Sequence, residues 1–169
     1  MASKVRICGI EPESIVDGRG IRYVLFVQGC PHHCPGCHNP QSHSFEGGKV
    51  VTIRDLFAEI VGNPLLRGVT FSGGEPFCQP EPLVELARMV HGRGLDVTTF
   101  TGYHYEELTA MRSNGVTALL EQTDILIDGP FVLGQKDLTL MFSGSQNQRI
   151  IDLNETRRCG RIVLDKLIA

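Results

Sequence analysis

Four short apolar stretches divide the chain, and each is dense in β-branched or aromatic residues. Such runs are typical of buried strands, because these side chains fit a pleated surface that is covered on both faces. Glycine, proline or paired turn residues bound each run, which favours strands over parts of long helices. The predicted strands are Ile21–Gln28, Gly68–Ser72, Leu95–Phe100 and Ile125–Ile127.

Helical spacing of apolar residues appears between these strands. Thr52 is a predicted N-cap for an amphipathic helix that Pro64 prevents from continuing. A second apolar stripe runs over Leu83–Val90. A third helix is expected over Tyr105–Arg112, with Asn114-Gly115 as its stop signal.

The ends of the chain add weaker elements. Val5–Ile10 reads as a short strand, and Asp17–Gly20 as a turn with two positions free to take positive φ. Residues 142–148 are polar and loop-like, and Ile162–Leu167 is a plausible last element. Alternating strands and helices imply βαβ crossovers, so we expect a single α/β domain over residues 1–169 with a parallel sheet.

Composition excludes some classes of partner. The net charge is −3, from 16 basic and 19 acidic residues, which gives no electrostatic case for a nucleic acid or a membrane surface. Neither a signal peptide nor a transmembrane run is apparent, so we expect a cytoplasmic protein whose thiols stay reduced. The six cysteines are then more readily ligands or inert thiols than disulfides; we interpret Cys8, Cys78 and Cys159 as buried or incidental.

Unusual residues follow each of the predicted strands. Three cysteines follow the first, Gly73-Gly74-Glu75 the second, Thr101-Gly102-Tyr103 the third and Asp128-Gly129-Pro130 the fourth. The carboxyl ends of parallel strands lie at one edge of the sheet, where α/β proteins place their active sites. The pattern therefore predicts one site built from all four loops.

Cys30, Cys34 and Cys37 form a C-x-x-x-C-x-x-C motif, which indicates a metal site of soft thiolate ligands. A structural zinc site would need a fourth ligand, such as His32, His33, His38 or Cys78, but no second cysteine pair follows downstream. The alternative is a 4Fe–4S cluster with one iron left free to bind a small molecule. Three ligands on one loop favour the cluster.

The other loops offer contacts for a ligand. Gly73 and Gly74 let main-chain groups approach it, and Glu75 is a predicted acceptor for a ligand ammonium. Thr99 and Thr101 are ordinary β-formers or, in a site, hydroxyl donors. Asp128 is as readily a turn residue as a ligand contact.

These motifs together resemble the radical S-adenosylmethionine (radical SAM) superfamily. Within it, the chain is similar to the activating proteins of anaerobic (class III) ribonucleoside-triphosphate reductases, over about Asp17 to Asp152. The resemblance rests on Asp17-Gly18-Arg19-Gly20-Ile21-Arg22, Gly29-Cys30-Pro31, Gly36-Cys37-His38-Asn39-Pro40, Phe71-Ser72-Gly73-Gly74-Glu75-Pro76, Thr101-Gly102-Tyr103, Asp128-Gly129-Pro130-Phe131 and Gly144-Ser145-Gln146-Asn147-Gln148-Arg149.

The resemblance implies a partial TIM-type βα barrel and a set of ligand contacts. Cys30, Cys34 and Cys37 would ligate three irons of a 4Fe–4S cluster, and S-adenosylmethionine would chelate the fourth. The remaining cofactor contacts implied are Gly73, Gly74, Glu75, Thr99, Thr101 and Asp128. One departure is Gly36, where many radical SAM proteins carry an aromatic residue that contacts the adenine, so this contact and the roles of His32 and His33 stay unassigned.

The resemblance also implies a reaction. Reductive cleavage of S-adenosylmethionine would give a 5′-deoxyadenosyl radical that abstracts hydrogen from a glycine Cα. The implied partners are the large subunit of the anaerobic ribonucleotide reductase and an electron donor such as flavodoxin or ferredoxin. No residue is nominated as a catalytic acid or base. The alternatives are activation of another glycyl-radical enzyme, of the formate-lyase type, or a zinc-binding adaptor without catalysis.

The carboxyl-terminal part of the chain carries three arginines, Arg157, Arg158 and Arg161. They form either a docking patch or, more simply, a solvated face.

Overall fold

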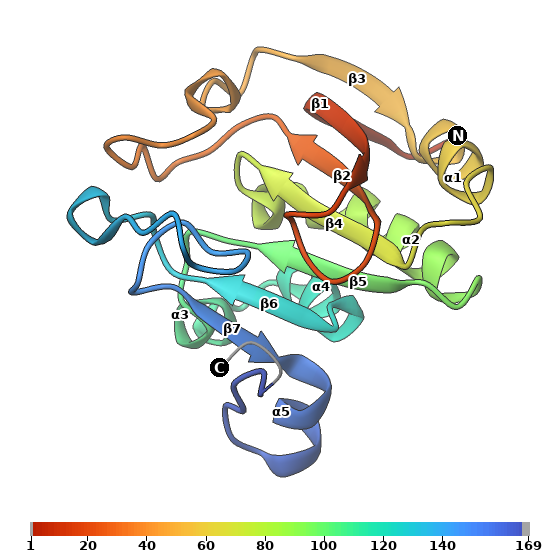
Figure 1. The fold of residues 1–169 in the computed structure, drawn as a ribbon. Coiled ribbons are helices and arrows are strands. Elements are labelled where there is room, and N and C mark those ends of the chain that lie inside the picture. Colours follow the sequence, from red (N-terminus) through yellow and green to blue (C-terminus); the bar gives the residue numbers. More distant parts are fainter. Residues whose placement is uncertain (1, 167–169) are drawn as a thin grey trace.

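A computed structural model describes residues 2–166, and its centre is a seven-stranded sheet in the order β3-β1-β2-β4-β5-β6-β7 (Figure 1). Four neighbouring strands are parallel and point the same way in the figure. They are β2 (Arg22–Val27), β4 (Gly68–Gly73), β5 (Asp96–Phe100) and β6 (Ile125–Asp128). The predicted buried strands are therefore confirmed to within two residues at each end.

The outer strands run antiparallel to their neighbours. They are β1 (Lys4–Ser14), which extends well beyond the predicted Val5–Ile10, β3 (Lys49–Thr52) and β7 (Arg149–Asp152). A parallel connection needs a crossover of a dozen or more residues, usually a helix. The short link from β1 to β2 has no such helix, so the two strands form an antiparallel pair. The sheet stays open, and the α/β prediction with an incomplete barrel is confirmed.

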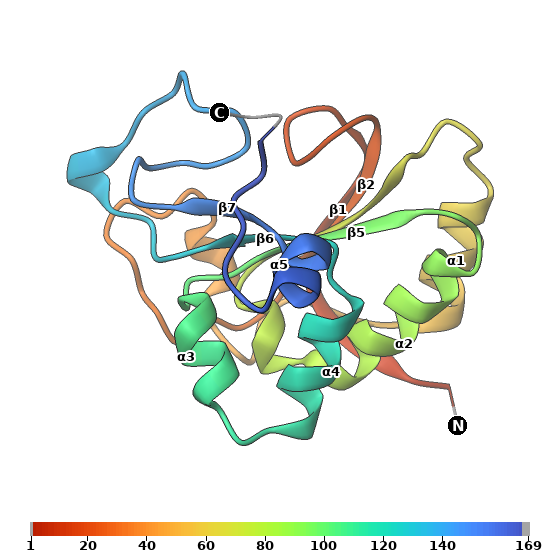
Figure 2. The same cartoon turned by 90° about the horizontal axis from the view of Figure 1, so that it is seen from below.

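Helices cover one face of the sheet (Figure 2). They are α1 (Ile53–Val61), α2 (Pro80–His91), α3 (Tyr105–Ala110) and α4 (Asn114–Gln122). The predicted cap is present, since Thr52 accepts a hydrogen bond from the Asp55 amide. Buried aliphatic residues of α1, α2 and α4 pack with those of the strands in one hydrophobic cluster.

Two helices were not predicted from the sequence. Asn114-Gly115 begins α4 rather than stopping the previous helix, because Ser113 caps the new helix by accepting from the Val116 amide. A side chain at Gly115 would collide with Glu81 of α2, so this glycine serves helix packing. The second missed helix is α5 (Leu153–Cys159), which Asp152 caps at the Glu155 amide.

The last predicted element reduces to one isolated β-bridge, between Leu164 and Ile151. Its final residue, Leu167, lies outside the described residues. In the part of the chain that the structure describes, no helix is long and apolar enough to cross a membrane.

Arg22 is a charged side chain that is buried at the start of β2. Its guanidinium donates to the Thr70 hydroxyl at 2.7 Å and to the Val69 carbonyl at 2.9 Å, and it pairs with Asp96 at 2.6 Å. Gly18 has a φ of +136° and leaves the space that this side chain fills. Gly18 and Gly20 both take positive φ, as predicted for the Asp17–Gly20 turn. The Arg22 side chain joins the start of β2 to β4 and β5.

Candidate active site

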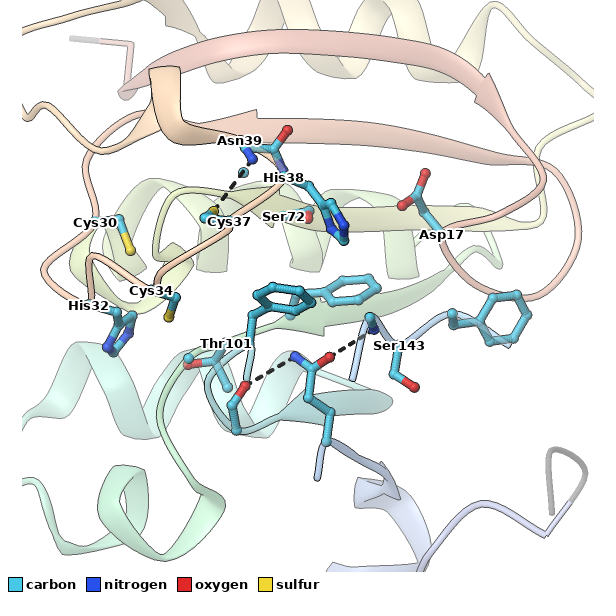
Figure 3. Close-up of a pocket in the computed structure, with 18 of the residues that line it drawn as sticks. Asp17, Cys30, His32, Cys34, Cys37, His38, Asn39, Ser72, Thr101 and Ser143 are labelled. Atoms are coloured by element: carbon cyan, nitrogen blue, oxygen red, sulfur yellow. Dashed lines mark hydrogen bonds between the residues drawn. The ribbon is translucent and has the colours of Figure 1, made fainter. Parts of the chain in front are cut away.

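A cavity of about 540 Å³ lies at the carboxyl ends of the parallel strands. Each of the four loops singled out in the sequence contributes lining residues, and a fifth segment, residues 131–148, closes one side. Figure 3 shows the three cysteines at one end of this cavity and Asp17 and Ser143 at the other. The volume is in the range typical of small-molecule sites.

The cysteine loop begins with Cys30, three residues after the end of β2. The loop is fixed by main-chain hydrogen bonds from Gly29 to Ser42 (2.7 Å) and from Cys30 to His43 (3.0 Å). Cys30 is buried, whereas Cys34 and Cys37 are partly exposed, and all three line the cavity. Burial raises the pKa of the Cys30 thiol, although amide hydrogen bonds from His32 and His33 act in the opposite direction. Metal binding must therefore displace the proton of Cys30.

The three thiols of the loop are the side chains here that could bind a metal centre. Thiolates bound to one zinc ion share that ion at about 2.3 Å. A 4Fe–4S cluster binds each thiolate through a different iron. Cys30, Cys34 and Cys37 could each take one iron of such a cluster at one end of the cavity.

The two glycines of the β4 loop allow close contact with the end of β2. The Gly74 amide donates to Val27 and the Glu75 amide to Gly29, both at 2.8 Å. A Cβ at Gly74 would lie 2.3 Å from the Gly29 carbonyl oxygen, and one at Gly73 would lie 2.6 Å from Phe26 Cα. Both glycines also line the cavity, so bare backbone faces the space beside the cysteines.

Glu75 is fully buried and is not among the residues that line the cavity. Its carboxylate accepts from the Phe77 amide (3.1 Å), the Thr101 hydroxyl (2.9 Å) and the Gly102 amide (2.9 Å). His32 Nε2 lies 2.6 Å from its second oxygen. The expected contact of Glu75 with a ligand ammonium stays a prediction.

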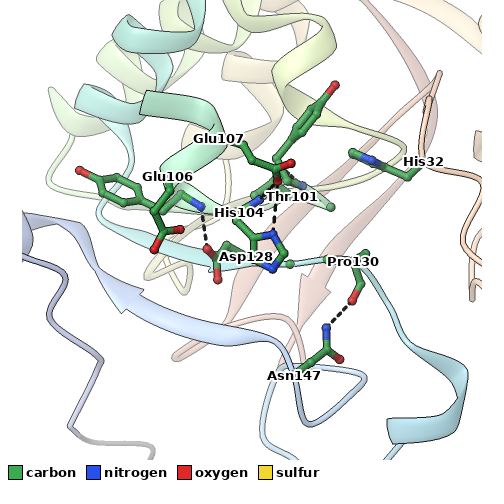
Figure 4. Close-up of polar contacts among 12 residues, drawn as sticks. His32, Thr101, His104, Glu106, Glu107, Asp128, Pro130 and Asn147 are labelled. Atoms are coloured by element: carbon green, nitrogen blue, oxygen red, sulfur yellow. Dashed lines mark hydrogen bonds and ion pairs between the residues drawn. The ribbon is translucent and has the colours of Figure 1, made fainter. Parts of the chain in front are cut away.

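The three remaining predicted contacts fall in different places. Thr101 lines the cavity. Thr99 is buried, and its hydroxyl lies 3.0 Å from that of Thr123, away from the lining. Asp128 is also buried and outside the lining, and it accepts from Arg149 Nε at 2.9 Å. It accepts a second hydrogen bond, from the Tyr105 amide, at 2.8 Å (Figure 4).

The sequence interpretation described residues 142–148 as a polar loop and did not expect residues 131–148 to line the cavity. Gln148 orders this segment, because its side chain accepts from the Gly144 amide and donates to the Gly129 carbonyl. Asn147 donates to the Pro130 carbonyl at 2.8 Å (Figure 4). In the sequence, the Asn147-Gln148 pair was the signal that could have indicated this ordered segment. The segment contributes Phe131, Asp137, Leu138, Leu140, Phe142, Ser143, Gly144 and Gln148 to the cavity.

Other predicted features lie outside this cavity. Cys78 and Cys159 are exposed rather than buried, and Cys8 is partly buried. Arg157 donates to the carbonyls of Leu120 and Thr123 at the end of α4, and Arg158 pairs with Glu155 on its own helix. These two arginines therefore have structural partners, which weakens the idea of a docking patch.

Comparisons with known proteins agree with the motifs. Residues 16–151 match the model of a "4Fe-4S single cluster domain" family. The anaerobic ribonucleoside-triphosphate reductase-activating protein of Haemophilus influenzae is 36% identical over 82% of this chain and 92% of the relative. That of Salmonella typhi is 35% identical over 81% and 92%. The chain belongs to this family of activating proteins.

Two further proteins are similar to this chain. The pyruvate formate-lyase-activating enzyme of Clostridium pasteurianum is 36% identical over 73% of this chain but 55% of its own length. A crystal structure of QueE from Escherichia coli superposes with a TM-score of 0.46 at 20% identity, over 59% of this chain and 53% of that chain. The radical SAM resemblance seen in the motifs is thus confirmed by the family match and the curated relatives.

Proposed function

We propose that this chain activates an anaerobic ribonucleoside-triphosphate reductase by creating a glycyl radical on its large subunit. The observation that carries the proposal is the position of Cys30, Cys34 and Cys37 at one end of a cavity of small-molecule size. The three thiolates would hold a 4Fe–4S cluster, and the rest of the cavity would hold S-adenosylmethionine. The reductase-activating relatives support the choice of target, because this chain covers 92% of their length.

The bound groups would supply the chemistry. A cluster held by Cys30, Cys34 and Cys37 would pass one electron, from a donor such as flavodoxin or ferredoxin, to S-adenosylmethionine. Cleavage would release methionine, and transfer of a hydrogen atom from a glycine Cα would give 5′-deoxyadenosine and a glycyl radical. This chain orients the reactants and excludes water. No acid or base is needed among its residues.

Each lining segment has a proposed part. The main chain of Gly73 and Gly74 would face the amino-acid portion of S-adenosylmethionine, and Thr101 also lines the cavity. His38 and Phe131 line the cavity, and their ring centroids are 5.0 Å apart. Their rings would offer the adenine the aromatic contact that Gly36 cannot provide.

A protein substrate is supported by the rim of the cavity. Val16 and Leu138 line it, yet 67% and 85% of their respective surfaces are exposed. Large exposed apolar groups grouped at one place are typical of interaction sites. We infer that the partner protein covers this rim when its glycine enters.

Anaerobic reconstitution with iron and sulfide tests the proposal. We expect a brown protein that, once reduced, converts S-adenosylmethionine to methionine and 5′-deoxyadenosine. A colourless protein that binds one zinc ion and leaves S-adenosylmethionine intact would exclude the cluster and favour the adaptor.

A second candidate is activation of a formate-lyase-type enzyme, which the Clostridium pasteurianum relative favours. The two targets separate when the reduced protein is mixed with each in turn. We expect a glycyl radical on the reductase; a radical formed only on the lyase would reverse the assignment.

A further inference from the structure

His32 lies within the cysteine motif but is packed against the neighbouring loop of β5. Its ring meets the ring of Tyr103 edge-on, with centroids 4.5 Å apart. A Cβ at Gly102 would lie 2.4 Å from His32 Cδ2, so only glycine leaves room for this imidazole. The Thr101-Gly102-Tyr103 motif is therefore shaped to receive a side chain of the cysteine loop.

The buried carboxylate of Glu75 completes this contact. An ionised carboxylate has about four acceptor sites. Four donors face it: the amides of Phe77 and Gly102, the Thr101 hydroxyl and His32 Nε2. No acceptor site is left for a ligand ammonium in this arrangement. An ionised carboxylate only accepts, so in this contact the imidazole donates from Nε2.

The four donors belong to three different segments. Phe77 lies in the short 3-10 helix Pro76–Cys78, Thr101 and Gly102 follow β5, and His32 lies between two of the cluster cysteines. Among residues 2–166, no Lys or Arg pairs with Glu75, and His32 is its one ionisable donor. The carboxylate thus joins the cysteine loop to two loops that frame the cavity.

We propose that Glu75 is a positioning residue that, through His32, fixes the cysteine loop against the β5 loop and so sets the place of the cluster relative to S-adenosylmethionine. This inference rests on the proposed function for the identity of the two ligands. It assigns His32 a role in holding the loop rather than in metal ligation. It also differs from the direct ammonium contact expected of Glu75 from the sequence.

The chain offers a matched control in the adjacent histidine. His33 is exposed, its ring faces His43 at 5.4 Å, and its φ of +50° is one that asparagine tolerates. Replacement of either histidine by asparagine removes the same ring, but only His32→Asn breaks the contact with Glu75.

The first measurement uses the protein without cluster or ligand. Amide hydrogen exchange of residues 32–34 and 36–37 is compared in the wild type, His32→Asn and His33→Asn. We expect faster exchange by about tenfold in His32→Asn alone, the loss typical of one hydrogen bond to a charged group. Equal exchange in the two variants would overturn the proposal, whatever the protein proves to activate.

The second measurement is the affinity of the reconstituted protein for S-adenosylmethionine, by equilibrium dialysis of the wild type, His32→Asn, Glu75→Gln and the double variant. A loop that is ordered only part of the time lowers the apparent affinity in proportion. We expect His32→Asn to raise the Kd about tenfold and Glu75→Gln to raise it at least as much, because Glu75→Gln also disturbs the contacts with Thr101 and Gly102. The double variant should be no worse than Glu75→Gln, since both variants disturb the contact between the two residues.

Two results would contradict this role. Weaker binding in Glu75→Gln with unchanged binding in His32→Asn would mean that Glu75 contacts the ligand directly. Additive losses in the double variant would mean that the two residues act separately. If Glu75→Gln fails to fold, the comparison of His32→Asn with His33→Asn still decides. A protein that does not bind S-adenosylmethionine at all would refute the proposed function, while the exchange experiment would still test the loop contact.

Discussion

Two fully buried carboxylates lie at the ends of parallel strands, Glu75 just after β4 and Asp128 at the end of β6. Asp128 is paired with the Arg149 guanidinium and caps α3 through the Tyr105 amide. Glu75 has a histidine in place of an arginine, and its donors come from loops around the cavity. The Asp128 carboxylate stabilises the scaffold, and the Glu75 carboxylate joins the segments that line the site. A strand-end carboxylate is thus defined by its donors rather than by its place in the sequence.

Removal of a cluster ligand near Glu75 should have the largest effect on activity. Cys34→Ala deletes one of three thiolates, so we expect iron content and reductive cleavage of S-adenosylmethionine to fall to background. Circular dichroism of the apo-protein serves as the control for folding. Retained cleavage in this variant would be incompatible with the proposed site.

Asp128→Asn should act on stability instead. It leaves the Arg149 charge without its buried partner, which costs about 3 kcal/mol in the free energy of unfolding. Urea titration measures this loss, and the folded fraction should bind iron and S-adenosylmethionine as the wild type does. A large loss of ligand affinity with unchanged stability would instead support the cofactor contact expected from the sequence.

Gly74→Ala tests how closely the β4 loop must approach the cysteine loop. The added methyl group would meet the Gly29 carbonyl oxygen at 2.3 Å, so the main chain must shift. We expect a loss of about 2 kcal/mol in stability, together with weak binding of S-adenosylmethionine. Gly134→Ala is the control, because a Cβ there meets nothing within 4 Å. Similar behaviour of the two variants would show that the close approach is unimportant.

The smallest expected effect is on stability, at Glu106. This exposed carboxylate pairs with Arg149, which also pairs with Asp128. A hydrogen bond from Arg149 lowers the pKa of Glu106 to about 2. A carboxyl group whose pKa falls on folding stabilises the protein above its unfolded pKa, and the effect is lost as the pH falls toward the folded pKa. Because 60% of the Glu106 side chain is exposed, the contribution stays below about 1 kcal/mol.

The variant Glu106→Gln tests the direction of this pH dependence of stability. The difference in unfolding free energy between wild type and variant should be largest near pH 7 and should shrink between about pH 4.5 and 2. A difference that grows as the pH falls would contradict the assigned pKa shift.

The four parallel strands, the Thr52 cap and the cysteine loop were predictable because each has a strong local signal. The direction of β1 was not, since it depends on whether the connection to β2 is long enough for a crossover. The direction of β7 was not either, because the long segment between β6 and β7 would allow both directions. At the site, Gly73, Gly74 and Thr101 were placed at the cavity from their position after strands. Apart from Phe77, the donors of Glu75 lie far from it in sequence, and so do those of Asp128, so only the folded chain distinguishes the two.

Electron paramagnetic resonance tests the central claim most directly. The reconstituted, reduced protein is mixed anaerobically with S-adenosylmethionine and the large subunit of an anaerobic ribonucleoside-triphosphate reductase. We predict a glycyl radical signal on the reductase that requires S-adenosylmethionine and is absent with Cys34→Ala. Cleavage of S-adenosylmethionine without any radical on the reductase would contradict the account.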